Sequence, residues 1–525
     1  RLNSNSIKID PPKKSIKLLI STSLVSFWTF LSRLLGLVRD IVLTSLLGAG
    51  LALDAFVVVM KIPSVFRRLF AEGAFNQAFV PILSEYKQQK SEAEVKDLIN
   101  HTFASLSVVL IIVTTLAFLA APFFVMVFAP GFYLEPLKKT LAIDILQITF
   151  PYLFFVSLVA LSGSIMNTYE KFALPALTPL FYNLTLVVVA IWIAPNQEIP
   201  IYAIAWGVFA AGCIQVLIQI WPLIKLGLLP KFHLNFKHPG VKRVMFLMVP
   251  GIIAGGVSQL NMLVDTVLAS LLPTGSPSWL YVSDRLMQLP LGIFAIAIGT
   301  VILPKLSALH TTGSKDDFSK TLDWAIRLIL LIGLPAVIGL IMLAEPIIIT
   351  LFERGEFTAL DSNKAALSLV ALSLGLVAFM LIKVLTPGFF ARQQPKKPVY
   401  VALFSMALNG FLAWLLGFRL GYNHVGLALA SSISAFFTII TLLYLLRREK
   451  IYSFEKGWFL FSIRLICASL ILYLTISFIN TDIEIWRNSY EIERFVRLLA
   501  ILVTGITAYF ATLWASGIRL KDLRN

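Results

Sequence analysis

Apolar runs of about twenty residues recur along the whole chain, and they constrain its fold more than any other feature. A helix of this length spans the hydrocarbon core of a bilayer. Only 14% of the 525 residues are charged and the mean hydropathy is +0.85, whereas soluble domains carry about 25% charged residues. The pattern predicts an all-α, polytopic membrane protein without a separate soluble domain.

We predict about fourteen membrane-spanning helices. Their expected ranges are 24–47, 51–84, 102–128, 138–166, 175–194, 200–224, 243–272, 278–303, 321–344, 364–388, 398–417, 424–446, 457–480 and 494–517. As a straight helix, segment 51–84 would be about 51 Å long, which exceeds the ~30 Å hydrocarbon core. We therefore expect Pro63 to kink this segment and its end to project into the cytoplasm.

The loops between these segments alternate in charge. The loops on one side, together with both termini, carry about 27 Lys and Arg, against about 8 on the other side. Because positively charged loops stay in the cytoplasm, both termini are expected there, including an N-terminal tail over residues 1–20. The same loops account for the formal net charge of +16, so the charge gives no support for a nucleic-acid partner.

The chain contains an internal repeat. Residues 39–50 (RDIVLTSLLGAG) match residues 264–275 (VDTVLASLLPTG) at seven of twelve positions, and the prolines 175 and 398 recur at a similar offset. A repeat of six helices, an even number, gives both copies one orientation, as in parallel-repeat transporters. The predicted divisions are a first lobe over 21–230, a second lobe over 231–450 and two extra helices over 451–525.

Six cationic residues lie inside the predicted spans: Arg33, Arg39, Lys61, Arg67, Arg68 and Arg285. Each costs roughly 2.5–3.5 kcal/mol at the bilayer centre, so six that faced lipid would cost on the order of 15–20 kcal/mol. They are therefore expected to face a wet interior, and a cation-lined cavity is typical of an anion site. Guanidinium groups suit phosphate, because their forked donors bind two oxygens at once.

Helical periodicity places polar and acidic residues beside these cations. The expected substrate-binding residues, from both lobes, are Ser32, Arg33, Arg39, Asp40, Asp54, Lys61, Arg67, Arg68, Glu72 and Arg285. The alternative is a set of buried ion pairs that lock helices together, with Arg39–Asp40, Asp54–Lys61 and Asp284–Arg285 as candidates. Buried ion pairs are weak stabilisers, since desolvation offsets their attraction, and this favours the substrate role.

Asp265 and Asn409 are expected at similar depth in the second lobe, where their side-chain oxygens form a candidate sodium site. The sequence offers no nucleophile with its base, no glycine-rich phosphate loop and no metal cluster. We therefore predict no enzymatic activity, no cofactor other than a coupling ion, and no ATP-driven step within this chain.

Five runs carry a family resemblance: 32–40 (SRLLGLVRD), 54–86, 283–290 (SDRLMQLP), 351–358 (LFERGEFT) and 383–399. They resemble the MurJ/MviN lipid II flippases of the multidrug/oligosaccharidyl-lipid/polysaccharide exporter superfamily, and the resemblance covers nearly all of the chain. It implies a fourteen-helix, two-lobed protein of the bacterial inner membrane. Such a protein moves undecaprenyl-pyrophosphate-linked disaccharide-pentapeptide to the outer leaflet by alternating access, for peptidoglycan synthesis.

By position, the family's cavity residues map onto the ten substrate-binding residues named above. The resemblance also implies that helices 457–517 form a groove for the lipid tail. Some relatives bind sodium, but Ala413 stands here where a second acid is expected. The expected partners are lipid II, membrane lipids and cell-wall synthesis enzymes, with the chain as a monomer. The alternatives are an exporter of another polyprenyl-linked saccharide or of drugs, and a non-transporting scaffold.

Overall fold

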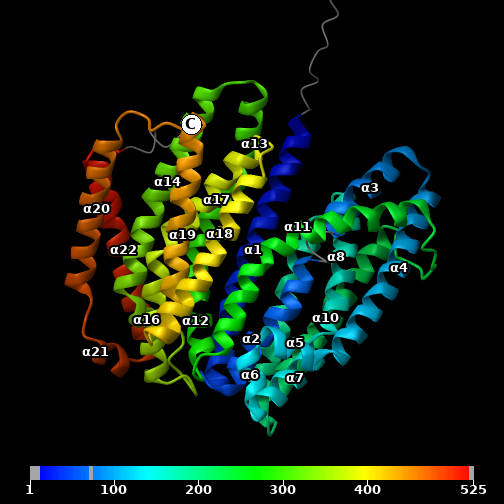
Figure 1. Cartoon of the computed structure of the whole chain (residues 1–525), viewed down its shortest axis with the longest axis horizontal. Coiled ribbons are helices and arrows are strands. Elements are labelled where there is room, and N and C mark those ends of the chain that lie inside the picture. The colour runs from blue at the N-terminus through cyan, green and yellow to red at the C-terminus, as the bar shows by residue number, and fades with distance from the viewer. Residues whose placement is uncertain (1–11, 70–74, 519–525) are drawn as a thin grey trace, which may run out of the picture. The chain divides into compact units, whose positions relative to one another are not determined.

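The computed structural model describes residues 12–69 and 75–518, and within them every regular element is helical (Figure 1). The helices up to residue 270 are α1 (Pro12–Leu47), α2 (Leu51–Phe66), α3 (Asn76–Gln89), α4 (Glu92–Leu119), α5 (Ala121–Phe128), α6 (Pro130–Leu134), α7 (Pro136–Thr149), α8 (Tyr152–Thr168), α9 (Ala173–Val188), α10 (Pro200–Lys225) and α11 (Pro239–Ser270).

The later helices are α12 (Ser276–Pro290), α13 (Ile296–Thr311), α14 (Lys315–Met342), α15 (Ala344–Leu351), α16 (Ala359–Leu374), α17 (Leu376–Phe390), α18 (Lys396–Ala413), α19 (Asn423–Arg448), α20 (Trp458–Ile479), α21 (Ile483–Asn488) and α22 (Glu491–Ala515). Within the described residues, short π-helical turns follow α2, α9, α12 and α18, at residues 67–69, Val189–Ile193, Leu291–Ala295 and Trp414–Arg419.

Ten helical segments of the described residues are long and apolar enough to cross a membrane, and the pair α16–α17, bent by 40°, raises the number to eleven. The bend falls at Gly375, where a Cβ atom would lie only 2.7 Å from Cα of Ser432 on α19. The three other predicted spans correspond to α1, α2 and α11, of 36, 16 and 32 residues. The prediction of an all-α, polytopic membrane protein is confirmed.

The second predicted span, 51–84, contains α2 and α3, and the expected kink at Pro63 and the expected cytoplasmic position of its end stay predictions. Helix α2 continues through Pro63, ends at Phe66 and gives way to a π-helical turn at residues 67–69. Helix α3 then begins at Asn76. Pro63 therefore lies within a helix, and the change from α-helical to π-helical hydrogen bonding comes after it.

Helix boundaries repeat along the chain as the sequence repeat predicts. Helices α4 and α14 begin at Glu92 and Lys315, 223 residues apart, and both have 28 residues. Helices α10 and α19 begin at Pro200 and Asn423, again 223 residues apart, and both have 26 residues. The two copies therefore share their order of helices as well as their sequence matches.

The chain divides into two compact units, neither of which is one continuous stretch. The first comprises Arg1–Leu46 and Val58–Leu263, and the second comprises Leu47–Val57 and Val264–Asn525. The start of α2 thus packs with the second unit, whereas its end packs with the first. The lobe boundaries at residues 230 and 450, which follow from the repeat, stay predictions.

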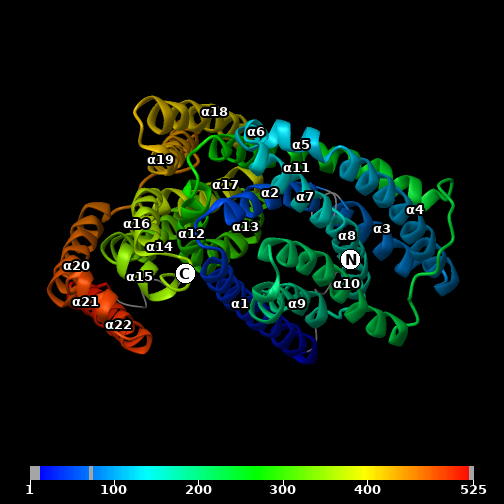
Figure 2. The same cartoon turned by 90° about the horizontal axis from the view of Figure 1, so that it is seen from below.

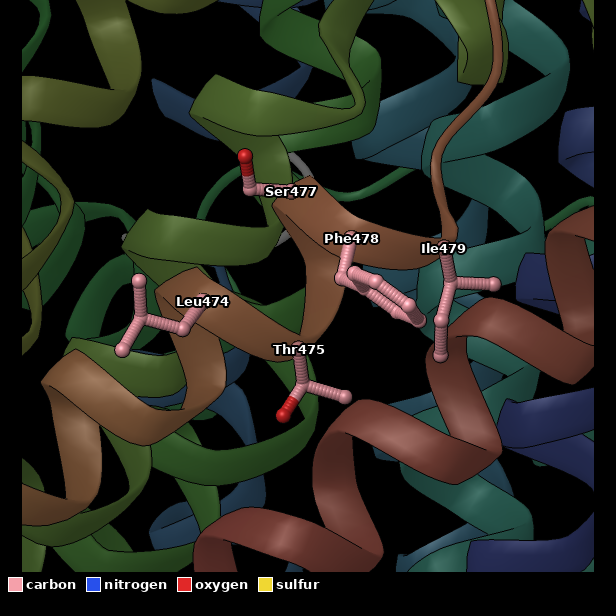
Figure 3. A pocket seen from close by; sticks show the side chains of 5 residues that line it. All are labelled: Leu474, Thr475, Ser477, Phe478 and Ile479. Atoms are coloured by element: carbon pink, nitrogen blue, oxygen red, sulfur yellow. The ribbon is translucent and has the colours of Figure 1, made fainter.

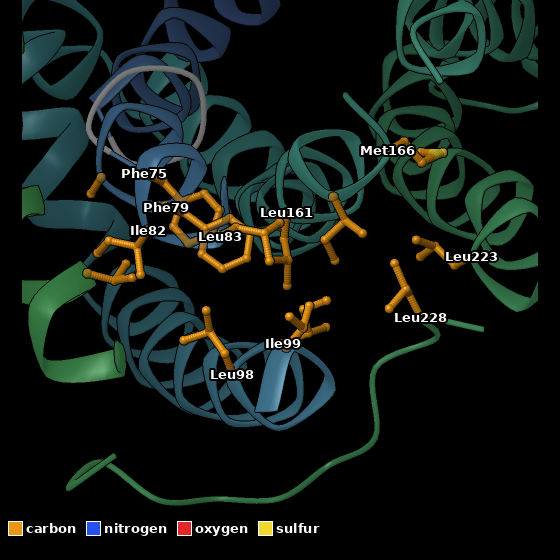
Figure 4. Close-up of a cluster of buried hydrophobic side chains, with 14 residues drawn as sticks. Phe75, Phe79, Ile82, Leu83, Leu98, Ile99, Leu161, Met166, Leu223 and Leu228 are labelled. Atoms are coloured by element: carbon orange, nitrogen blue, oxygen red, sulfur yellow. The ribbon is translucent and has the colours of Figure 1, made fainter. Parts of the chain in front are cut away.

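In the first unit, one apolar cluster holds α3, α4, α8 and α10 together (Figure 4). Within the cluster, the rings of Phe75 and Phe79 stack with centroids 5.1 Å apart. Leu228, just after α10, is buried in the same cluster. This contact fixes the start of the connector between α10 and α11 against the ends of α4 and α8.

In the second unit, α20 packs along α22 and against α14 (Figure 2). The buried carboxylate of Asp323 on α14 fixes the segment that leads into α20. It accepts hydrogen bonds from the Tyr452 hydroxyl at 2.8 Å and the Trp458 indole at 2.6 Å, and it pairs with Arg327 at 2.8 Å. The Arg327 guanidinium lies between this carboxylate and the ring of Trp458, with Cζ 5.0 Å from the ring centroid.

Candidate functional site

Arg39 and Asp40 on α1, the first predicted pair, take part in a hydrogen-bond network that joins α1 to α9. Arg39 donates from Nε and Nη2 to the fully buried Asp40 carboxylate at 2.9 and 2.6 Å. Its Nη1 donates to the Asn183 side chain at 2.9 Å, and the Asn183 amide donates to the Ser32 carbonyl at 3.0 Å. These contacts favour a structural role for Arg39, with Ser32 contributing its backbone.

Arg33 on α1 and Lys61 on α2 behave differently. Both side chains are half-buried, so each retains access to solvent or to a ligand. Within residues 12–69 and 75–518, neither forms a hydrogen bond or an ion pair. A cation inside an apolar segment is costly unless something neutralises it. These two positions are therefore the best candidates for contact with an anionic ligand.

Arg67 and Arg68 lie in the π-helical turn that follows α2. Such turns are frequent at functional sites, because they expose backbone groups and redirect side chains. Arg68 is exposed and donates to the side chain of Gln259 on α11 at 3.4 Å, while Arg67 is half-buried. Glu72, which the sequence pattern places on the same face, lies outside the described residues.

Asp54 caps α12. Its side chain is only 1% exposed and accepts hydrogen bonds from the backbone N–H of Gly275 at 2.6 Å and of Ser278 at 3.0 Å. The Ser278 hydroxyl adds a third hydrogen bond at 2.5 Å. Gly275 has φ +94 and cannot cap the helix itself, so a carboxylate from α2 satisfies the free N–H groups. These contacts give no support to the alternative Asp54–Lys61 pair.

Arg285 stands on α12, so the cap at Asp54 also positions the helix that carries this cation. The Arg285 side chain is half-buried. The neighbouring Asp284 accepts a hydrogen bond from Gln288, one turn further along the helix, at 2.5 Å. Asp284 therefore has a partner within its own helix besides any pairing with Arg285.

The two residues of the candidate sodium site do lie together. The Asn409 amide donates to the Asp265 carboxylate at 2.8 Å, and the Ser431 hydroxyl donates to the Asn409 oxygen at 3.4 Å. In this arrangement the amide presents its N–H group to the carboxylate, so a sodium ion between them would require the amide to turn, and the sodium site stays a prediction. The Ala413 side chain has no atom that could bind a cation. Within the described ranges, no group of three or more His, Cys, Asp or Glu is suited to a metal ion.

The end of α20 carries an open hollow with apolar and hydroxyl side chains. A pocket of about 630 Å³ lies at the end of α20, where Leu474, Thr475, Ser477, Phe478 and Ile479 line it (Figure 3). Helix α22 runs close beside α20, because Gly505 leaves room for Leu472: a Cβ atom there would lie 2.9 Å from its side chain. The surface of this helix pair is apolar, with Phe459 and Phe478 both strongly exposed.

Sequence reasoning missed the residues that complete these contacts. Asn183 and Ser278 join helices far apart in the chain, and no pattern in one sequence links them to Arg39 or Asp54. One signal was present: Asn183 is a polar side chain inside the predicted span 175–194, and such residues usually make interhelical contacts. Tyr182 beside it lies over the Arg39 guanidinium, with the ring centroid 5.7 Å from Cζ.

A repeated helical fold with half-buried cations inside its spans defines a membrane transporter. A family model described as lipid II flippase MurJ matches residues 43–500, which is most of the chain. The protein belongs to the MurJ family of lipid II flippases.

Relatives and solved structures agree with this assignment. A probable lipid II flippase MurJ of Vibrio cholerae is 42% identical over 521 residues, covering 97% of this chain and 98% of the relative. The lipid II flippase MurJ of Burkholderia cenocepacia is 36% identical, covering 95% and 98%. A solved lipid II flippase MurJ in an inward closed conformation matches with a TM-score of 0.77 and 29% identity, covering 93% and 97%. An inward-facing multidrug resistance transporter of the MATE family shares the fold alone, with a TM-score of 0.66 and 14% identity over 80% of this chain and 94% of that one.

Proposed function

We propose that the protein moves lipid II from the cytoplasmic to the periplasmic leaflet of the bacterial inner membrane. Family membership supports the substrate, because the relatives are named for it. The observation that carries the mechanism is the pair Arg33 and Lys61, half-buried cations without a partner among the described residues. A pyrophosphate would neutralise them, and forked guanidinium donors would replace its water.

Only the headgroup needs a polar path. The prenyl tail remains in hydrocarbon throughout, and the exposed apolar surface of α20 and α22 offers it a place to lie. The internal repeat supports alternating access, in which the headgroup site opens to one side of the membrane and then to the other. The charge of the loops supports cytoplasmic termini. We propose no covalent step.

A leaflet-accessibility assay tests the function directly. Cells that depend on this protein are treated so that it is inactivated within minutes, and lipid II is then cleaved from outside by a periplasmic enzyme that attacks only the outer leaflet. We expect outer-leaflet lipid II to fall while total lipid II rises. A scaffold would leave the outer-leaflet fraction unchanged, and an exporter of another saccharide would leave lipid II untouched.

Arg285→Ala should abolish transport without loss of membrane-inserted protein, because we propose that this guanidinium binds the pyrophosphate. Arg285→Lys should retain part of the activity, since an ammonium keeps the charge and loses the fork. The measurement is complementation of flippase-depleted cells beside the amount of protein in the membrane. If adding Asp284→Ala restores the transport that Arg285→Ala abolishes, the two residues form a structural ion pair and the substrate role is wrong.

Transport should slow when the membrane potential collapses and should not change when potassium replaces sodium. Moving charge outward gains roughly 2.3 kcal/mol per charge per 100 mV, so a pyrophosphate with about two charges gains on the order of 4–5 kcal/mol. We expect transport to be independent of sodium because the Asn409 amide already donates a hydrogen bond to the Asp265 carboxylate. Proteoliposomes with fluorescent lipid II provide the measurement. A strict need for sodium would show that the side chains rearrange around an ion.

A further inference from the structure

The connector between α10 and α11, residues 226–238, carries exposed apolar side chains outside any helix. Phe232 is 59% exposed, Leu234 48% and Phe236 40%. Irregular backbone does not occur in contact with hydrocarbon, so the connector lies outside the bilayer core. Three apolar side chains spaced two residues apart therefore need a cover that is neither bulk water nor the hydrocarbon core.

The connector is fixed on α4 by its other side. The backbone N–H of Lys231 donates to Asn100 at 2.7 Å, and the carbonyl of His233 lies 2.6 Å from Nδ1 of His101. The side chains of Phe232 and Leu234, next to these contacts, remain exposed. The buried Leu228 holds the start of the connector, and His238 beside Asp97 at 3.4 Å holds its end. Figure 4 shows the connector passing the end of α4 that carries Leu98 and Ile99.

The connector is continuous at both ends with apolar, membrane-spanning helices. At the end of α10, Trp221 is 62% exposed and the Lys225 ammonium lies 3.5 Å from its ring centroid. Near the start of α11, Phe246 is 76% exposed. An exposed tryptophan beside a lysine is typical of the interface between hydrocarbon and water. The connector is therefore expected to lie at the edge of the bilayer.

The charged side chains around the connector indicate which class of lipid headgroup it binds. Lys231, Lys237 and Lys242 form no ion pair within the part of the chain that the structure describes. Of the carboxylates on the helices packed beside them, Glu85 pairs with Arg243 at 2.8 Å, whereas Asp97 contacts the imidazoles of His101 and His238 and keeps its own charge, so the three lysines outnumber it. The surface around the apolar side chains is thus cationic, and a cationic, apolar surface at a bilayer edge suits anionic headgroups.

We propose that residues 229–237 form an interfacial anchor, which inserts Phe232, Leu234 and Phe236 between the headgroups and binds anionic phospholipid through Lys231 and Lys237. The anchor ties the end of α4 and the chain between the two repeats to one depth in the leaflet. Its leaflet is cytoplasmic if the proposed orientation holds. The anchor itself does not depend on which lipid the protein transports.

Two neighbouring labels test the anchor in the full chain. In a background with Cys213→Ala and Cys467→Ser, Leu234→Cys and Asn235→Cys are each labelled with an environment-sensitive fluorophore. The protein is placed in nanodiscs of phosphatidylethanolamine and phosphatidylglycerol. We expect a spin-labelled lipid to quench the label at residue 234 several-fold more than the label at 235, and aqueous iodide to show the reverse. Quenching of both labels by iodide alone would overturn the anchor and point to a protein partner.

The role of charge is tested in the same system. Lipid quenching at residue 234 should be several-fold stronger with phosphatidylglycerol than with phosphatidylcholine in its place. The Lys231→Gln/Lys237→Gln variant should lose this difference. The matched Lys90→Gln/Lys96→Gln variant, with one change just after α3 and the other on α4, should keep it. Equal quenching in both lipid mixtures would overturn the binding of anionic lipid. Because the readout is the depth of a label, failure of the anchor and failure of lipid II transport are distinguishable.

Discussion

Arg33→Ala should abolish transport and leave the amount of membrane-inserted protein unchanged, whereas Arg39→Ala should lower the amount of folded protein. The two residues lie six positions apart on α1 and provide a matched pair. Arg33 contacts no described residue by hydrogen bond or ion pair, so its replacement removes no such contact from the fold. Removing Arg39 takes away the guanidinium that holds the fully buried Asp40. An orphaned buried charge costs about 3–5 kcal/mol, a large share of the ~5–15 kcal/mol stability of a typical fold.

The measurement is complementation of depleted cells together with membrane protein level and thermal unfolding in detergent. Asp40→Asn added to Arg39→Ala should recover much of the lost protein, because a neutral amide replaces the orphaned charge. The same second change should not rescue Arg33→Ala. If Arg33→Ala instead lowers the protein level as much as Arg39→Ala does, Arg33 is a structural residue and the proposed contact with pyrophosphate fails.

Asp54→Ala should destabilise the protein strongly, because α12 loses its cap. Three hydrogen bonds to a carboxylate disappear, two of them from backbone N–H groups that remain buried, and we expect a loss of about 2–4 kcal/mol. Transport should fall as well, since α12 carries Arg285. Thermal unfolding of the purified variant gives the magnitude, and complementation gives the effect on transport.

Asp54→Asn is the matched control, since its amide oxygen still accepts one or two of the three hydrogen bonds. It should recover part of the stability and a similar part of the transport. Ser278→Ala removes only the hydroxyl contact and should have the mildest effect of the three. A normal melting temperature for Asp54→Ala with complete loss of transport would show that the carboxylate acts on the substrate and not as a cap.

The sequence predicted the helices well, because hydrocarbon permits few other structures. The last two expected spans, 457–480 and 494–517, correspond to α20 and α22 within about three residues. The π-helical turn after α2 was not predictable, because such a turn depends on the packing of its surroundings and leaves no pattern in the sequence. Boundaries set by apolar length could be predicted, whereas breaks set by contacts could not.

The roles of individual site residues were harder to separate. Helical periodicity places Arg33 and Asp40 on one face, but it does not show that Asp40 is held by Arg39 and that Arg39 is held by Asn183. It places Asp54 and Lys61 together as well, although Asp54 caps a helix that begins 222 residues later. Contacts between distant segments decide which charge belongs to the fold, and one sequence does not contain that information.

The cap at Asp54 also has a consequence for the order of events during synthesis. Gly275, which donates to Asp54, follows it by 221 residues. At roughly 5–20 residues per second, the ribosome needs on the order of 10–45 s to add them. Throughout that interval, the nascent chain holds a carboxylate near the start of α2 whose final partners do not yet exist. We therefore expect the start of α2 to reach its final position only after α12 has left the ribosome.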